Sequence, residues 1–199
     1  FINISNNIFG TIGANRIDFY SAVGLSNVLI QNNIIFGSIR SLGAPNSLIS
    51  HNVFLNTQEA FEFFGPFPFS NVMIKDNIFY NANPNTNTTN CTYNNNMSFG
   101  TITYSNMNGT GNLDNVNPEF VNVGTGAYNS SYDFHLGPAS QGIGASSTGD
   151  DIGYYGGTLK ATVTGETSGM PVIRTMDILN PNVPLNGNIN VNVRSTINR

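Results

Sequence analysis

A short pattern that recurs along the first half of the chain constrains its fold most strongly. A run of β-branched or aromatic residues precedes an asparagine, and a second apolar run follows it. The pattern occurs in "FINISNNIF" (1–9), "NVLIQNNIIF" (27–36), "NSLISHNVFL" (46–55) and "NVMIKDNIFY" (71–80). Aligned on the asparagine before the second run, these stretches superimpose Asn7, Asn33, Asn52 and Asn77. The intervals of 26, 19 and 25 residues are typical of stacked repeats.

The repeat predicts an all-β chain folded as a right-handed parallel β-helix. Leucine-rich repeats would need Leu at fixed positions and usually a helical return, and no helix-length stretch of 3.6-residue period is present. A hexapeptide helix would repeat every six residues, which the intervals exclude. Successive coils of a β-helix lie about 4.8 Å apart. Asparagine suits a sharp corner in each coil, because it tolerates the left-handed conformation and its amide both donates and accepts hydrogen bonds. We therefore expect the four aligned asparagines to form a structural ladder.

The composition excludes several classes of protein. Only 9% of the 199 residues are charged, and 34 asparagines supply much of the polar surface. The net charge is −4, and no basic run could follow a phosphate backbone, so nucleic acid is not an expected partner. No segment approaches the 18 apolar residues of a membrane span. The single cysteine, Cys91, cannot form an internal disulfide.

Two stretches between the repeats are interpreted as loops. The stretch 59–70, "EAFEFFGPFPFS", is rich in Phe and Pro, and Pro interrupts a regular ladder. It is either an aromatic platform for sugar rings or a partner protein, with Phe67 and Phe69 exposed, or a loop folded back with buried rings. The Asn-rich stretch 81–100 is interpreted as a long excursion between coils.

Three motifs in the order "NPEF" (117–120), "YDFHLGPASQGIGAS" (132–146) and "DDIGYYGG" (150–157) follow the repeats. This order resembles the end of the pectate-lyase-like, right-handed parallel β-helix proteins of bacterial surfaces. The resemblance implies that these motifs form a last coil and finish the solenoid. It covers most of residues 1–157 and is specific for fold but not for activity. "SQGI" (140–143) departs from the Ser-Pro-Ala-Ile of many relatives, which changes only a turn.

Residues 158–199 differ from the repeats and form a second predicted region. Two alternating runs, "VIRTMDIL" (172–179) and "NINVNVRS" (188–195), flank a turn rich in Pro, Asn and Gly, which predicts a small antiparallel β unit. Such a unit could cap the open end of a solenoid, whose unpaired backbone groups invite aggregation. It could also serve as an export signal, as compact C-terminal β modules do in the type IX secretion system. Because "FINISNNIF" begins inside a coil, we also expect further coils or a partner before Phe1.

The candidate ligand-binding residues are few, and none is assigned a catalytic role. Polysaccharide lyases of this fold use carboxylates that hold Ca²⁺ and a basic residue, but no metal or other cofactor is indicated here. Glu59 and Glu62, with Asp76 one coil later, could face one groove beside Phe67 and Phe69. His51 is expected to replace Asn32 in a corner column, and His135 to face solvent.

These observations favour a secreted or cell-surface bacterial protein, non-catalytic and structural, adhesive or glycan-contacting, that forms the C-terminal part of a longer chain. Expected partners are polysaccharides or proteins of the cell surface or of secretion machinery. Two alternatives remain open. One is a polysaccharide lyase or glycoside hydrolase whose active coils lie mostly upstream. The other is a secretion-system cargo recognised through its C-terminal tail.

Overall fold

The chain divides into two compact units, Phe1–Lys160 and Ala161–Arg199. The computed structural model describes residues 1–10, 16–19, 25–63, 68–84, 88–100, 107–160, 171–180 and 187–197. These described residues contain strands and turns and no α-helix. The first unit is a parallel β-solenoid of about four turns, as the repeat predicts. No helix in the described part of the chain has the length and hydropathy that a bilayer span requires.

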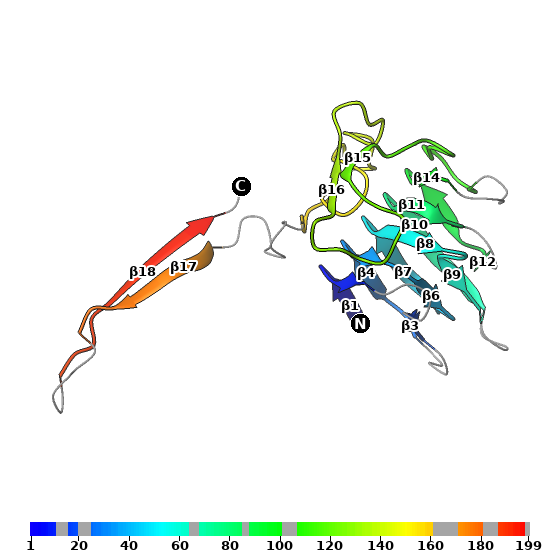
Figure 1. Ribbon diagram of the computed structural model, residues 1–199. Coiled ribbons are helices and arrows are strands. Elements are labelled where there is room, and N and C mark those ends of the chain that lie inside the picture. The colour runs from blue at the N-terminus through cyan, green and yellow to red at the C-terminus, as the bar shows by residue number, and fades with distance from the viewer. Residues whose placement is uncertain are drawn as a thin grey trace. The chain divides into compact units, whose positions relative to one another are not determined.

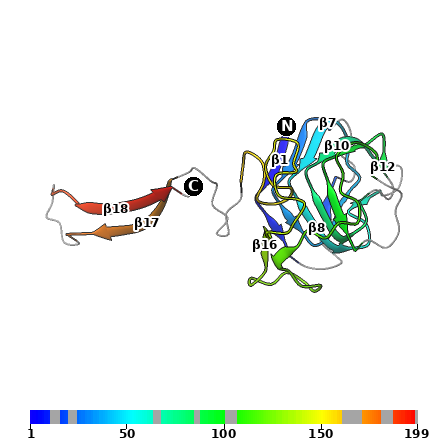
Figure 2. The ribbon, with the colours of Figure 1, turned by 90° about the horizontal axis from the view of Figure 1, so that it is seen from above.

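Three parallel sheets form the walls of the solenoid (Figures 1 and 2). Sheet A contains β1 (Ile2–Ser5), β4 (Val28–Gln31), β7 (Gly43–Ser50), β10 (Phe69–Lys75), β12 (Thr88–Thr89) and β13 (Thr92–Asn94). Sheet B contains β2 (Ile8–Phe9), β5 (Ile34–Ile35), β8 (Val53–Thr57), β11 (Ile78–Ala82) and β14 (Met97–Phe99). Sheet C contains β3 (Arg16–Asp18), β6 (Ser38–Arg40) and β9 (Phe61–Glu62). In the first three coils the chain therefore visits sheets A, B and C in turn.

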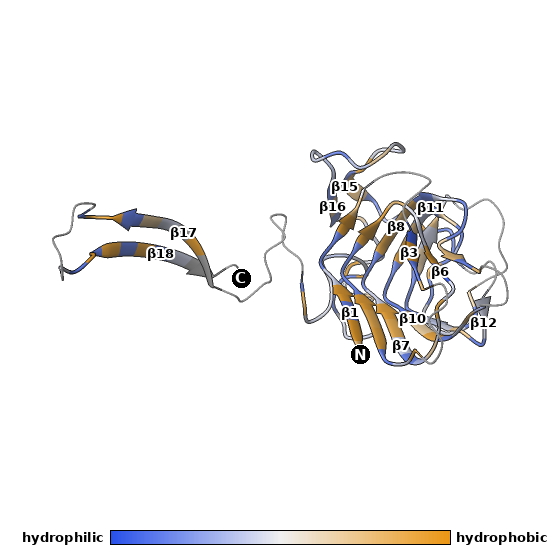
Figure 3. Cartoon of the chain, turned by 90° about the horizontal axis from the view of Figure 1, so that it is seen from below, coloured by the Kyte–Doolittle hydropathy of each residue, from blue (hydrophilic) through white to orange (hydrophobic). Residues whose placement is uncertain are grey.

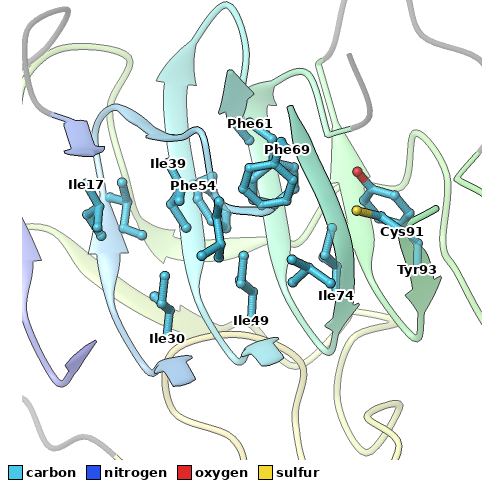
Figure 4. Packing of buried hydrophobic residues seen from close by; sticks show 14 of the residues in the cluster. Ile17, Ile30, Ile39, Ile49, Phe54, Phe61, Phe69, Ile74, Cys91 and Tyr93 are labelled. Carbon is cyan, nitrogen blue, oxygen red and sulfur yellow. The ribbon is translucent and has the colours of Figure 1, made fainter. Parts of the chain in front are cut away.

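Apolar side chains that point between the sheets form the core. Ile30, Ile49 and Ile74 take equivalent positions in successive coils of sheet A and are fully buried (Figure 4). Phe54 and Phe79 are register partners in sheet B, and their rings stack with centroids 5.2 Å apart. Figure 3 shows that the strands of sheet A are largely hydrophobic. Side chains of the same type thus lie above one another along the solenoid axis. This is the packing that the repeated Ile and Phe positions predict.

A ladder of asparagines runs along the corner between sheets A and B. It contains Asn7, Asn33, Asn52, Asn77, Asn96 and Asn112. The backbone N–H and the Nδ2 of Asn33 both donate to Oδ1 of Asn52 at 2.9 Å. Asn52 donates to Asn77 in the same way, at 2.9 and 3.0 Å, and its Nδ2 also reaches the carbonyl of Ile30 at 2.9 Å. The predicted ladder is present, and two asparagines that were not predicted extend it.

The residue before each of the first five ladder asparagines has a left-handed backbone. These residues are Asn6, Asn32, His51, Asp76 and Asn95, with φ between 52° and 59°. Asparagine and aspartate accept this conformation more readily than most residues, because their short polar side chains bond locally. His51 occupies the position that Asn32 has one coil earlier, as the sequence predicted. This corner column also anchors a later part of the chain.

The prediction that residues 81–100 form an excursion between coils is wrong. β12 and β13 both pair with β10, and β14 pairs with β11, so this stretch supplies a further coil. Asn96 and Asn112 continue the ladder through it. The repeat was obscured because Thr, Asn and Ser replace most of the Ile and Val that mark earlier coils.

Residues 115–157, called here the covering segment, first run back along sheet B from the last coil to the first. The N–H of Val116 donates to the carbonyl of Ser98 at 2.8 Å. Further along, Asn56 donates to the carbonyl of Gly126 at 3.1 Å. Tyr128 then donates to the carbonyl of Gly10 at 3.0 Å. Within this segment β15 (Phe120–Asn122) and β16 (Asp133–Leu136) pair antiparallel. The expectation that these motifs form another parallel coil is therefore wrong.

The covering segment also passes along the corner column. Asn95 donates to the carbonyl of Ala145 at 3.1 Å, and Asn32 donates to the carbonyl of Gly156 at 2.9 Å. The Gly153 N–H donates to the carbonyl of Asp76 at 2.9 Å. The later part of the covering segment is therefore bonded to at least three coils through their left-handed corner residues.

This segment explains why sheet B is buried on both faces. Ile34, Val53 and Ile78 share one register position, alternate with core residues and are at most 2% exposed. Gly153 approaches so closely that a Cβ there would lie 2.6 Å from Cδ1 of Ile78. Strands buried on both faces have continuous apolar runs. The triplets "IIF", "VFL" and "IFY" of the repeat are such runs.

The second unit contains the predicted antiparallel pair. β17 (Pro171–Ile178) pairs with β18 (Val191–Ile197). Met176 is opposite Val193 and Ile178 is opposite Val191, and all four side chains are exposed. One face of this two-stranded sheet is consequently apolar.

Candidate functional site

The outer face of sheet C carries a group of four charged side chains. Arg16 and Asp18 come from β3, Arg40 from β6 and Glu62 from β9. Asp18, Arg40 and Glu62 share one register position in successive coils. Stacking therefore places an anion, a cation and an anion above one another, although these residues are far apart in the sequence.

Two ion pairs connect these three coils. Nε of Arg16 lies 3.0 Å from Oε2 of Glu62, so this contact spans two coil steps. The Arg40 guanidinium bonds Oδ2 of Asp18 in the neighbouring coil. Arg16 keeps 40% of its side chain exposed and Glu62 keeps 23%. Ion pairs this accessible to water contribute at most about 1 kcal/mol to stability. They nevertheless bring hydrogen-bonding groups from three coils together in one array.

A hollow of about 300 Å³ lies over this array. It is lined by Arg16, Gln58, Glu59, Glu62 and Phe63. Phe63 is 52% exposed. The hollow thus combines carboxylate acceptors, guanidinium and amide donors, and an accessible aromatic ring. Sites for hydroxyl-rich ligands use a few convergent polar groups together with an apolar or aromatic surface.

Only some of the residues predicted for ligand binding lie in this hollow. Glu59 and Glu62 line it together. Phe67 lies outside the described residues. The prediction that Phe69 contacts a ligand is wrong. Its ring is fully buried and stacks on that of Phe61, with the ring centroids 4.6 Å apart. The alternative interpretation, that the loop folds back with buried rings, fits Phe69 but not the exposed Phe63.

Asp76 does not share the groove predicted for it. The side chain is fully buried at the corner between sheets A and B. The N–H of Ser147 donates to Oδ1 of Asp76 at 2.6 Å, and the Ser147 hydroxyl donates to Oδ2 at 2.7 Å. Nζ of Lys75 lies 3.5 Å from Oδ2 of Asp76 and donates to the Ser147 hydroxyl at 2.9 Å. Asp76 therefore fixes the covering segment to the solenoid and is not accessible to a ligand.

His51 completes this buried polar cluster. Its Nε2 lies 3.5 Å from Oδ2 of Asp76, and its Nδ1 has no hydrogen-bond partner among the described residues. Burial lowers the pKa of His51; the negative charge of Asp76 opposes this shift, and the positive charge of Lys75 adds to it. Gly156 and Gly157 pack against the ring, since a Cβ at either would lie within 3 Å of it. The arrangement is suited to structural anchoring.

Other titratable groups lie on the covering segment. His135 is exposed, as expected, and its ring stacks on Tyr155 with centroids 3.8 Å apart. Oδ1 of Asp151 accepts a bond from the N–H of Gly144 at 3.0 Å, and Asp150 pairs with Lys160 at 3.2 Å. Within the described ranges, no three His, Cys, Asp or Glu side chains lie close enough together to hold a metal ion.

Sequence reasoning missed three residues of the hollow, namely Arg16, Gln58 and Phe63. Arg16 and Glu62 are 46 positions apart in the sequence. They meet because their strands, β3 and β9, lie in the same sheet two coils apart. Gln58 and Phe63 flank the predicted glutamates, so their proximity in sequence was a usable signal. Comparisons of this chain with protein-family models, with curated proteins and with solved structures found no match.

Proposed function

We propose that this chain is a non-catalytic module of a secreted or cell-surface bacterial protein, and that it contacts a hydroxyl-rich polysaccharide through the hollow on sheet C. The observation that carries the proposal is the combination, in one hollow, of Arg16, Gln58, two glutamates and the exposed ring of Phe63. One ion pair joins Arg16 and Glu62 before a ligand arrives. Such preorganisation lowers the cost of ordering side chains on binding.

The rest of the solenoid suits the role of a rigid support. The ladder and the stacked core repeat in every coil, and the covering segment ties several coils together. In stacked repeats each unit is stabilised by its neighbours. A binding face on sheet C is thereby held at a defined position on a stiff element.

A glycan array followed by titration of the bound sugars tests this proposal. We expect Phe63→Ala and Glu62→Gln each to weaken binding about tenfold, because each removes one directional contact worth about 1.4 kcal/mol. Glu119→Gln is the matched control, since Glu119 is exposed in the covering segment and does not line the hollow. Binding that is unchanged in Phe63→Ala and Glu62→Gln would contradict the proposal.

A catalytic function is the second candidate, and one observation favours it. Glu59 and Glu62 share the hollow with Arg16, so carboxylates and a cationic group converge on one site. Glycoside hydrolysis uses such a pair of carboxylates as acid and base or nucleophile. Incubation of the chain with pectins, alginates and glycosaminoglycans distinguishes the candidates. New reducing or unsaturated ends that disappear in Glu59→Gln and Glu62→Gln would establish the enzyme.

Recognition of the tail by a secretion system is a third candidate. It is favoured by the division of the chain at residue 160 and by the exposed apolar face of β17 and β18. Deletion of residues 171–199 should then abolish export from the producing cell while leaving the intracellular protein folded. Normal export of the shortened protein would remove this candidate.

A further inference from the structure

A second hollow, of about 360 Å³, lies on the outer face of sheet A, where the covering segment contributes no lining residue. It is lined by Asn46, Ser47, Asn71, Val72, Met73, Asn90 and Thr92. These residues come from three successive coils, so the hollow follows the solenoid axis. It shares no residue with the hollow on sheet C.

Asn46, Asn71 and Asn90 form a regular column in this hollow. The pairing of β7, β10, β12 and β13 places them at equivalent positions, and all three have left-handed φ, of 58°, 59° and 52°. Their amides therefore project from the same place in each coil, about 4.8 Å apart. Asn71 donates to the hydroxyl of Ser70 at 3.2 Å. Among the described residues, the side chains of Asn46 and Asn90 have no hydrogen-bond partner, and both are exposed.

The chemistry of the lining restricts the ligand. None of the seven residues is charged, so a charged ligand would find no countercharge. An amide both donates and accepts, as a sugar hydroxyl does. Met73 lines the hollow two residues along β10 from Asn71 and is 47% exposed, so it offers a polarisable apolar surface to the carbon face of a ring. Backbone groups in the middle of the sheet are used by neighbouring strands, so an added peptide strand cannot pair here.

We propose that this hollow binds a neutral polysaccharide that lies along the solenoid axis across three coils. The column offers one amide per coil, and a polymer with hydroxyl groups at a comparable repeat can engage several of them together. The affinity should then depend on the length of the ligand, because each added sugar reaches the next amide. This site is separate from the one on sheet C and does not depend on it.

Titration calorimetry on the full chain, with neutral gluco- and manno-oligosaccharides of one to six units, tests the proposal. We expect the affinity to rise with length and to level off once the ligand spans the three asparagines. The double variant Asn46→Gly/Asn90→Gly should bind the longest ligand at least ~10-fold more weakly, because two amides that bond the ligand are lost. Glycine is the appropriate replacement, since it accepts a positive φ.

Two controls make the result specific. Asn27→Gly changes the same column one coil earlier, where φ is 57°, but Asn27 does not line the hollow, so binding should stay within about twofold of the native chain. Glu119→Gln changes an exposed residue that lines neither hollow and should also leave this binding intact. The proposal is overturned if no oligosaccharide of the panel binds, if affinity is independent of length, or if the double variant binds like the native chain.

Discussion

At the scale of single residues, the asparagine ladder is the feature on which the solenoid most depends. Asn52 accepts two bonds from Asn33 and donates to Asn77 and to two carbonyls, all in a buried corner. Asn52→Ala leaves several buried groups unpaired, each costing about 1–3 kcal/mol, so we expect a loss of more than about 3 kcal/mol in the free energy of unfolding. Asn7→Ala, at the exposed start of the ladder, should cost about 1 kcal/mol. Urea denaturation measures both, and equal losses would contradict the argument.

His51 should make stability depend on pH. Burial is the main reason why the pKa of His51 is lowered in the folded state, so folding favours the neutral imidazole. The ordinary pKa of histidine is 6.5. Above this pH the contribution of neutral His51 to the free energy of unfolding is fully present, and it is lost as the pH falls from 6.5 toward the lowered pKa of the folded state. His51→Asn, the residue found in this column one coil earlier, should abolish the pH dependence in that window, and His135→Asn should retain it. Chemical denaturation between pH 7 and the titration range of carboxylates provides the measurement.

At the scale of elements, the covering segment determines how sheet B is buried, and two glycines test this contact. Gly153 has a φ of +92° and no room for a Cβ beside Ile78, whereas Gly149 has a φ of +82° and nothing within 4 Å of the added Cβ. Both Ala variants incur the backbone penalty of about 1 kcal/mol. Only Gly153→Ala adds a clash, typically about 1–3 kcal/mol. Limited proteolysis should therefore cut residues 139–157 faster in Gly153→Ala than in Gly149→Ala. Equal rates would show that the close packing of Gly153 is unimportant.

The same elements show what could be predicted from sequence. Ile34 and Ile35 are consecutive apolar residues buried on opposite faces of sheet B. Two consecutive apolar residues follow the ladder asparagine in each of the four repeats, so this feature was visible in the sequence. The element that covers Ile34 was not predictable from the repeat, because the corner contact from Asn32 to Tyr154 spans 122 positions. Likewise, the sequence identified Glu62 as a candidate binding residue, because it lies beside the Phe-rich loop. It did not identify Arg16, because the contact between Arg16 and Glu62 depends on which coils stack together. Local patterns determine the coil, whereas the site depends on register between coils.

At the scale of the whole molecule, the two units should differ strongly in local stability. β8 and β11 are buried on both faces and lie between neighbouring strands of the sheet. β17 and β18 form a two-stranded sheet with exposed apolar side chains, and such isolated pairs are marginally stable in water. Hydrogen exchange of the full chain should thus show amides of 171–178 and 191–197 exchanging orders of magnitude faster than those of 53–55 and 78–80. The N–H of Asn3, on the first strand of sheet A, is the internal reference for a less protected amide within the solenoid. If β17 and β18 were instead as protected as β8, their apolar face would have to be stabilised by a partner, and the tail would have to be regarded as part of a larger folded assembly.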